Sequence, residues 1–239
     1  MLHLVSAIDL NFFLQFDYRP LLVSMKTAVA AMVFVSIFGI LAAWLTFKVS
    51  QRTKSLLDAI FTLPMVMPPT VVGFFLLVIL GRKTALGAWL IDHNLSLIFS
   101  WPATVIAAAV VSFPLMYKTV RGSFEQIDPD LIAAGRILGF SEFKILLRVM
   151  MPLTWPSLAA GFVLAFARAV GEFGATLFVA GNFPGVTQTM PMAVYFAWAG
   201  GDMSVAGLWV ILIAIFSFVS VFAINKYIER KNQQKYSGI

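Results

Sequence analysis

The chain has 239 residues, of which 60% are hydrophobic and only 12% are charged. Soluble domains carry about a quarter of their residues as charged ones, and several uncharged runs here reach the roughly 20 residues that cross a bilayer. This argues against a soluble protein and predicts an all-α, polytopic membrane protein. The net charge of +6 raises nucleic acid as a partner, but basic residues of membrane proteins collect in cytoplasmic loops.

Residues suited to metal or nucleophilic chemistry are scarce. There is no cysteine, and the two histidines, His3 and His93, lie far apart. The chain therefore lacks a disulfide framework, a thiol nucleophile and the usual nitrogen and sulfur metal ligands. We expect it to bind no metal and no cofactor of its own.

Five apolar runs predict membrane spans. They cover about residues 20–47, 59–80, 101–118, 154–180 and 205–225. A sixth run, residues 190–200, is shorter, and its Tyr195 and Trp198 suit the headgroup level, so we expect an interfacial or re-entrant piece. The first nineteen residues lack the basic start of a signal peptide, so we expect no cleavage there.

The basic residues indicate how these spans are oriented. Twelve of the seventeen fall on one side, after the first, third and fifth spans: Lys48, Arg52, Lys54, Lys118, Arg121, Arg136, Lys144, Arg148, Lys226, Arg230, Lys231 and Lys235. Four fall on the other side, and Arg168 lies within the fourth span. The positive-inside rule then places the N-terminus outside and the C-terminus in the cytoplasm. Topology explains the basic excess, so no nucleic acid partner is expected.

The second span contains the segment LPMVMPP, in which Pro64, Pro68 and Pro69 remove helix donors. One straight helix is therefore not expected. Broken backbone at membrane depth is tolerated only where protein or a water-filled cavity surrounds it. The pattern favours a transport pathway or a moving gate.

The loop after the third span predicts two short helices joined by a sharp turn. Asp128 caps a helix that begins at Pro129, with Asp130 beside its positive end, and Gly139 closes it in the left-handed conformation. Ser141 caps a second helix that ends near Pro152. The apolar faces are predicted as Leu131, Ala134, Gly135 and Leu138 on the first helix, and Phe143, Leu146, Leu147 and Met150 on the second.

Several readings of this loop are open. An amphipathic loop packed on the membrane surface is one, and a DNA-binding helix-turn-helix is another. A unit this small, held at both ends by membrane spans, does not reach a major groove. The loop also resembles the EAA loop of ABC importer permeases, in Ala133, Ala134 and Gly135, then Gly139, then Val149, Met151 and Pro152. The glycine, the proline and their spacing match, while Ala133 replaces the glutamate of the pattern and Gly135 its second alanine.

Two further stretches narrow the resemblance. LPMVMPPTVVGFFLLVILG, from Leu63, and ARAVGEFGATLFVAGNFPGVTQTMP, from Ala167, are similar to segments of molybdate permeases, with sulfate and tungstate permeases as close relatives. The resemblance implies one transmembrane domain over 1–239 with the type I ABC importer permease fold, about 20–225 forming the membrane core and 119–153 a cytoplasmic coupling loop.

The resemblance also implies partners. They are a second copy of this chain, two cytosolic ABC ATPase subunits that carry ATP and Mg, and an extracytoplasmic oxyanion-binding protein, at a bacterial inner membrane. The implied ATPase-coupling residues are Asp130, Leu131, Ala133, Ala134, Gly135, Leu138, Gly139, Phe140 and Pro152. The chain contains no GxxxxGK[ST] phosphate loop, so we expect a transport subunit and not an enzyme.

The fourth span places Arg168 and Glu172 in apolar surroundings. Four residues apart on a helix, they share a face and can pair, which offsets part of the desolvation cost. One hypothesis is a structural or gating pair beside a kink flanked by Gly171 and Gly174, and the other is a pathway where Arg168 favours an oxyanion. We favour the first, because intramembrane charges usually pair inside the bundle.

Functions from other classes make different demands. A permease for sulfate or tungstate shares every feature above. An ion-coupled secondary transporter typically has an internal repeat, and we find no convincing one. An intramembrane enzyme needs a nucleophile with a base, or a set of metal ligands, which one arginine and one glutamate do not supply.

Overall fold

A computed structural model describes residues 16–236, and these residues form helices and loops without a strand. The expected absence of N-terminal cleavage concerns residues that lie mostly outside this range. The helices are α3 (Arg19–Lys48), α4 (Gln51–Val66), α5 (Pro69–Leu80), α6 (Ala85–Asp92), α7 (Trp101–Phe124), α8 (Pro129–Ile137), α9 (Glu142–Ile145), the π-helical η1 (Leu146–Met150), α10 (Met151–Leu153), α11 (Trp155–Val170), α12 (Gly174–Ala180), α13 (Met190–Ala199) and α14 (Met203–Tyr236).

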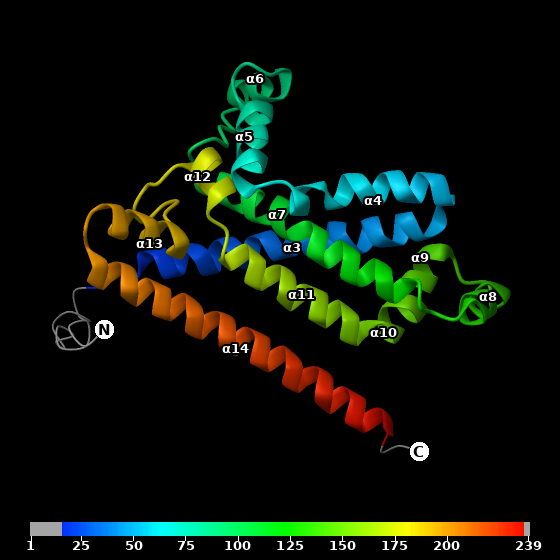
Figure 1. Ribbon diagram of the computed structural model, residues 1–239. Helices are drawn as coiled ribbons and strands as arrows, with labels where there is room; N and C mark the ends of the chain where they lie inside the picture. The colour runs from blue at the N-terminus through cyan, green and yellow to red at the C-terminus, as the bar shows by residue number, and fades with distance from the viewer. Residues whose placement is uncertain (1–15, 237–239) are drawn as a thin grey trace.

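Among the residues that the structure describes, three single helices are long and apolar enough to cross a membrane: α3, α7 and α14. They confirm the first, third and fifth predicted spans. In Figure 1, α3, α7, α11 and α14 run lengthwise through the molecule, with α7 packed between α3 and α11, and α14 lying along α11. The apolar window of α7 is 61% buried and that of α14 only 11%, so α7 is the inner helix and α14 leaves most of its apolar surface uncovered by the rest of the chain.

Small residues allow the inner helices to approach closely. A Cβ atom added to Gly39 of α3 would lie 2.9 Å from Cγ of Met116, and one added to Gly161 of α11 would lie 3.1 Å from Cβ of Thr119. Met116 and Thr119 belong to α7, so both neighbours pack against it through glycine. Membrane helices associate mainly through such close packing, because lipid tails are as apolar as the side chains.

The second predicted span is broken, as its prolines predict. α4 and α5 meet at 109° with one short break between them. Pro64 lies inside α4 without ending it, whereas Pro68 precedes α5 in an extended conformation and Pro69 is the first residue of α5. Two consecutive residues without an N–H, and the steric limit on the residue before a proline, end the helix here.

The fourth predicted span, 154–180, also consists of two helices. α11 ends at Val170 and α12 begins at Gly174. At its other end, α11 meets the helical segment Glu142–Leu153, which comprises α9, η1 and α10, at 82° around Thr154. The predicted short sixth segment is the ten-residue helix α13, too short to cross a bilayer. α13 packs beside α14 and α3, where the Met190 amide donates a hydrogen bond of 2.8 Å to Oγ of Ser24.

Candidate functional site

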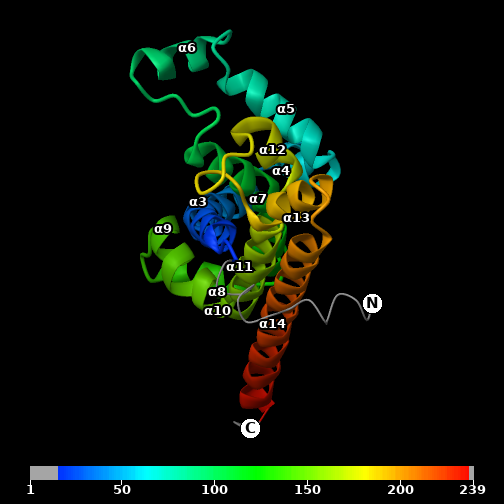
Figure 2. The same cartoon turned by 90° about the vertical axis from the view of Figure 1, so that its left-hand side faces the viewer.

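The two broken spans meet at their breaks. A Cβ atom added to Gly174 would lie 3.1 Å from Cβ of Pro69, and one added to Gly73 would lie 2.7 Å from Cα of Ala175. The start of α5 and the start of α12 are therefore in backbone contact, which only glycine permits. Figures 1 and 2 both place α12 against α5. Sequence reasoning identified each break but not their contact.

Glu172 joins the two sides of the second break. Its Oε1 accepts a hydrogen bond of 2.7 Å from the Ala175 amide, and its Oε2 lies 2.7 Å from Nη1 of Arg168. The Glu172 side chain is 2% exposed and that of Arg168 is 32% exposed. The pairing agrees with the sequence-based prediction. The carboxylate also satisfies an amide of the first turn of α12, which the sequence analysis did not foresee.

The expectation that Arg168 and Glu172 share one helix face is wrong. α11 ends at Val170, and the Gly171 amide donates its bond back to Ala167. Glu172 therefore follows the helix end and reaches back across it. The pair connects a helix to the break that follows, so it holds the shape of the break and not only the position of one helix.

The second candidate region is the hairpin of α8 and α9, whose caps form as the sequence predicts. Oδ1 of Asp128 accepts from the Asp130 amide at 2.9 Å, and Oγ of Ser141 accepts from the Lys144 amide at 3.3 Å. Gly139 has φ +72°, and the Phe140 amide donates to the Gly135 carbonyl at 3.1 Å. This is the Schellman arrangement that ends a helix through a left-handed glycine.

Only part of the predicted apolar face of α8 is buried within this chain. Gly135 is buried against Ile145, whose Cγ1 would lie 3.3 Å from an added Cβ, and Ile132 beside it is 5% exposed. Leu131 and Leu138, placed on the same face by the sequence analysis, are 46% and 71% exposed. The core face is centred on Ile132 and Gly135, because the closeness of α9 selects the side that carries glycine.

The second helix of the hairpin is less regular than predicted. The Met151 amide donates to the Leu146 carbonyl, the wide π-type bond that defines η1. Pro152 follows without an N–H to continue the ladder, and helical structure ends at Leu153. Leu146 and Met150 are buried, whereas Phe143 and Leu147 are 54% and 48% exposed.

Ion pairs attach the hairpin to the bundle. Glu142 accepts from Nε of Arg136 at 2.8 Å and lies 3.3 Å from Nζ of Lys48, at the end of α3. The hydrogen bond from Arg136, helped by Lys48, holds the pKa of the Glu142 carboxyl below its ordinary value.

Within residues 16–236, no group of three or more histidine, cysteine or acidic side chains is arranged to hold a metal ion.

Solved structures share the fold of this chain. The fold matches that of a bacterial ABC transporter involved in the import of the acidic polysaccharide alginate, with a TM-score of 0.75 and 16% identity over 93% of this chain and 84% of that one. It also matches the MetNI methionine ABC transporter, with a TM-score of 0.68 and 14% identity over 93% of this chain and 99% of that one. The architecture is that of a type I ABC importer permease.

The chain belongs to the family of binding-protein-dependent transport system inner membrane components, whose model matches residues 35–234. It is therefore a multi-pass inner membrane permease. It is 44% identical over 213 residues to the putative molybdenum transport system permease protein YvgM of Bacillus subtilis (strain 168), covering 87% of this chain and 92% of that one. It is 39% identical over 222 residues to the molybdenum transport system permease protein ModB of Escherichia coli (strain K12), covering 92% and 96%.

A sulfate permease is also similar. The sulfate transport system permease protein CysT of Escherichia coli (strain K12) is 30% identical over 203 residues, covering 85% of this chain and 73% of that one. The family-level resemblance inferred from the sequence is thus confirmed, with the molybdenum relatives more similar than this sulfate relative.

Proposed function

We propose that this chain is the membrane-spanning subunit of an ATP-driven importer for a tetrahedral oxyanion, molybdate. A sulfate or tungstate permease is the alternative, since all three anions are tetrahedral dianions, and an ion-coupled secondary transporter is a more distant one. The observation that carries the proposal is the sequence identity of 44% to a putative molybdenum permease over 87% of this chain. The sulfate relative at 30% supports the wider class of oxyanion.

The assembly we propose contains two copies of this chain, two cytosolic ABC ATPase subunits and an extracytoplasmic oxyanion-binding protein. ATP and Mg belong to the ATPase. The hairpin supports this division of labour, because Ile137 and Leu138 are 87% and 71% exposed on a short helix with its own rigid turn. Exposed apolar side chains on a water-facing hairpin suit burial by a partner.

The gate in this scheme lies where the two broken spans meet. Its residues are Pro64, Pro68, Pro69, Arg168, Gly171, Glu172 and Gly174. The backbone contact of α5 with α12 supports a coupled movement of both breaks, and the Arg168–Glu172 pair supports a structural or gating role for these charges. The N-terminus lies outside and the C-terminus in the cytoplasm, on the basis of the basic-residue bias.

Uptake measurements test the proposal. The chain is co-expressed with an ABC ATPase and a binding protein of the same system in cells without molybdate uptake, and entry of radiolabelled molybdate is followed. We expect uptake that requires ATP hydrolysis, persists when an ionophore removes the proton gradient, and is competed more strongly by molybdate than by sulfate. Uptake that follows the ion gradient would favour a secondary transporter, and stronger competition by sulfate or tungstate would reassign the anion.

A further inference from the structure

α4 is attached to the bundle in an unusual way. None of its sixteen residues is buried, whereas α3 and α7 beside it each bury many. Its main apolar contact is Phe61, whose ring lies edge-on to Phe113 at 5.7 Å and to Tyr117 at 5.1 Å between ring centroids. Packing alone therefore fixes α4 less firmly than its neighbours.

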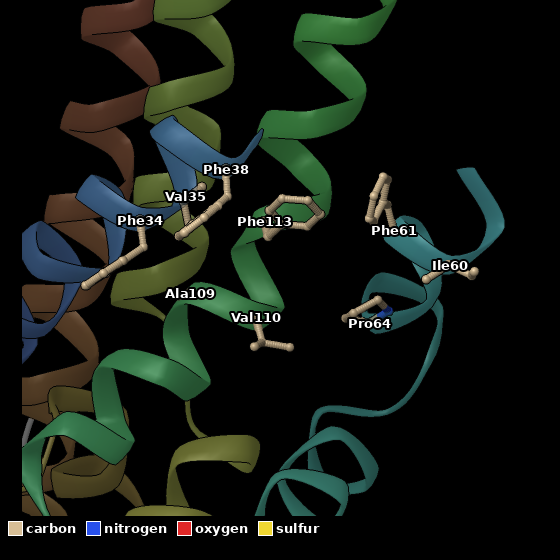
Figure 3. Close-up of a pocket in the computed structure, with 9 residues that line it drawn as sticks. All are labelled: Phe34, Val35, Phe38, Ile60, Phe61, Pro64, Ala109, Val110 and Phe113. Carbon is tan, nitrogen blue, oxygen red and sulfur yellow. The ribbon is translucent and has the colours of Figure 1, made fainter. Parts of the chain in front are cut away.

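A cavity of about 260 Å³ separates the far half of α4 from α3 and α7. Its lining is wholly apolar: Phe34, Val35, Phe38, Ile60, Phe61, Pro64, Ala109, Val110 and Phe113. Figure 3 shows Ile60, Phe61 and Pro64 of α4 on one side of it and Val110 and Phe113 of α7 on the other. In a bilayer such surfaces lose little when they separate, because hydrocarbon replaces the apolar contacts.

Charged side chains hold the other half of α4. Lys54 pairs with Glu125, and Asp58 pairs with Arg121. Nε of Arg121 also lies 3.1 Å from Oε1 of Glu125, so the four groups form one network, which we call the α4–α7 ion cluster. Their side chains are only 18–35% exposed, so these pairs are less screened than fully exposed ones.

A break in the helical structure lies at each end of α4. The two residues Val49 and Ser50 connect it to α3, and the Met67–Pro68 break with its 109° bend connects it to α5. Beyond that break, α5 is in backbone contact with α12, next to Glu172. The chain thus links α4 through the break to α5, and through the α5–α12 contact to the second broken span.

The geometry points to the α4–α7 ion cluster as the group that sets the tilt of α4. While Lys54, Asp58, Arg121 and Glu125 are paired, α4 stays against α7. When the pairs open, α4 tilts about its connection to α3, the apolar cavity widens, and the α5–α12 contact shifts. The cluster lies near the Lys48–Glu142 ion pair of the hairpin, because Lys48 precedes α4 by only a short turn. This role in transport rests on the proposed function, whereas the control of tilt does not.

A distance measurement tests the control of tilt. Since the chain has no cysteine, spin labels on Met65→Cys of α4 and Leu164→Cys of α11 report one distance; these residues are 53% and 45% exposed. The labelled full chain is mixed with an excess of the unlabelled chain and placed in lipid nanodiscs, so that the distance is measured within one copy even where two copies associate. We expect one narrow distance distribution, and a second, longer population when Asp58→Asn and Glu125→Gln are introduced together.

Glu142→Gln is the matched control, because it removes one acidic charge from the other ion network at the same end of the molecule. We expect Glu142→Gln to leave the distance distribution narrow. We expect the same of Asp58→Glu, because this variant keeps the negative charge. An unchanged distribution in the double variant overturns the inference, and so does an equal broadening in Glu142→Gln. Uptake is measured separately. If the unsubstituted chain takes up no molybdate, the proposed function is contradicted, whereas the distance result remains valid.

Discussion

Glu172 makes contacts on both sides of a helix break, and this decides what its removal would do. Its carboxylate is almost fully buried, accepts a hydrogen bond from an amide of α12 and forms an ion pair with the Arg168 guanidinium. Arg168 is about one-third exposed, so part of its charge is already solvated. The two partners therefore differ in what each leaves behind when the other is removed.

We expect Arg168→Ala to destabilise the protein by about 2–3 kcal/mol, because it leaves a buried carboxylate without its counter-ion. Adding Glu172→Gln to it should recover much of this loss, since the amide oxygen of glutamine still accepts from Ala175 and no charge remains. Thermal unfolding of the purified chain in detergent measures the stability of each variant. A separate molybdate uptake assay measures the effect on transport. Equal stability of Arg168→Ala and the unsubstituted chain would mean that the carboxylate is solvated and not dependent on the pair.

At the scale of elements, the α8–α9 hairpin combines a regular cap with exposed apolar side chains. Its turn depends on one residue, Gly139, whose φ of +72° lies in the left-handed region. An added Cβ would meet no atom within 4 Å. The effect of a substitution there is thus a backbone effect without a packing clash.

We expect Gly139→Val to cost roughly 1–2 kcal/mol in the turn and to reduce copurification of a tagged ATPase, while membrane insertion is kept. Gly139→Asn is the matched control, because asparagine tolerates the left-handed conformation far better than valine does. Stimulated ATP hydrolysis in reconstituted vesicles provides a second readout. If the valine variant retains full ATPase binding, the geometry of this turn is not needed for coupling.

At the scale of the whole molecule, charge gathers at one end of the bundle. The Lys48–Glu142 pair and the α4–α7 ion cluster lie there, beside the hairpin, at the right of Figure 1. We propose, from the positive-inside rule, that this is the cytoplasmic end. In Figure 1, α13 lies toward the opposite end, and α5 carries α6 away from the side of the bundle.

Cysteine labelling tests this orientation. Lys54 is held in an ion pair and Lys144 lies over the Phe140 ring, so the exposed neighbours Ser55 and Arg148 are better sites. We expect Ser55→Cys and Arg148→Cys to resist an impermeant thiol reagent in intact cells and to react in inside-out vesicles. Asp92→Cys, also exposed, should show the reverse. Labelling of position 148 from outside intact cells would contradict this orientation.

The sequence by itself determined the class of this protein, the approximate spans, the broken second span and the caps of the hairpin. Each follows from local chemistry: apolar runs must be about as long as the bilayer is thick, consecutive prolines end a helix, and aspartate, serine and glycine cap helices wherever they stand. Pairing of Arg168 with Glu172 was also within reach, because they are only four residues apart.

Only the tertiary structure decided which of these local features meet. The contact of Gly73 with Ala175 and the ion pairs of α4 with α7 join residues far apart in sequence, and no periodicity encodes such proximity. The same holds for the buried face of α8, where Ile132 and Gly135 face inward because Ile145 packs against them. Local sequence sets what each segment can form, whereas close packing between segments selects which surface is buried and which remains for a partner.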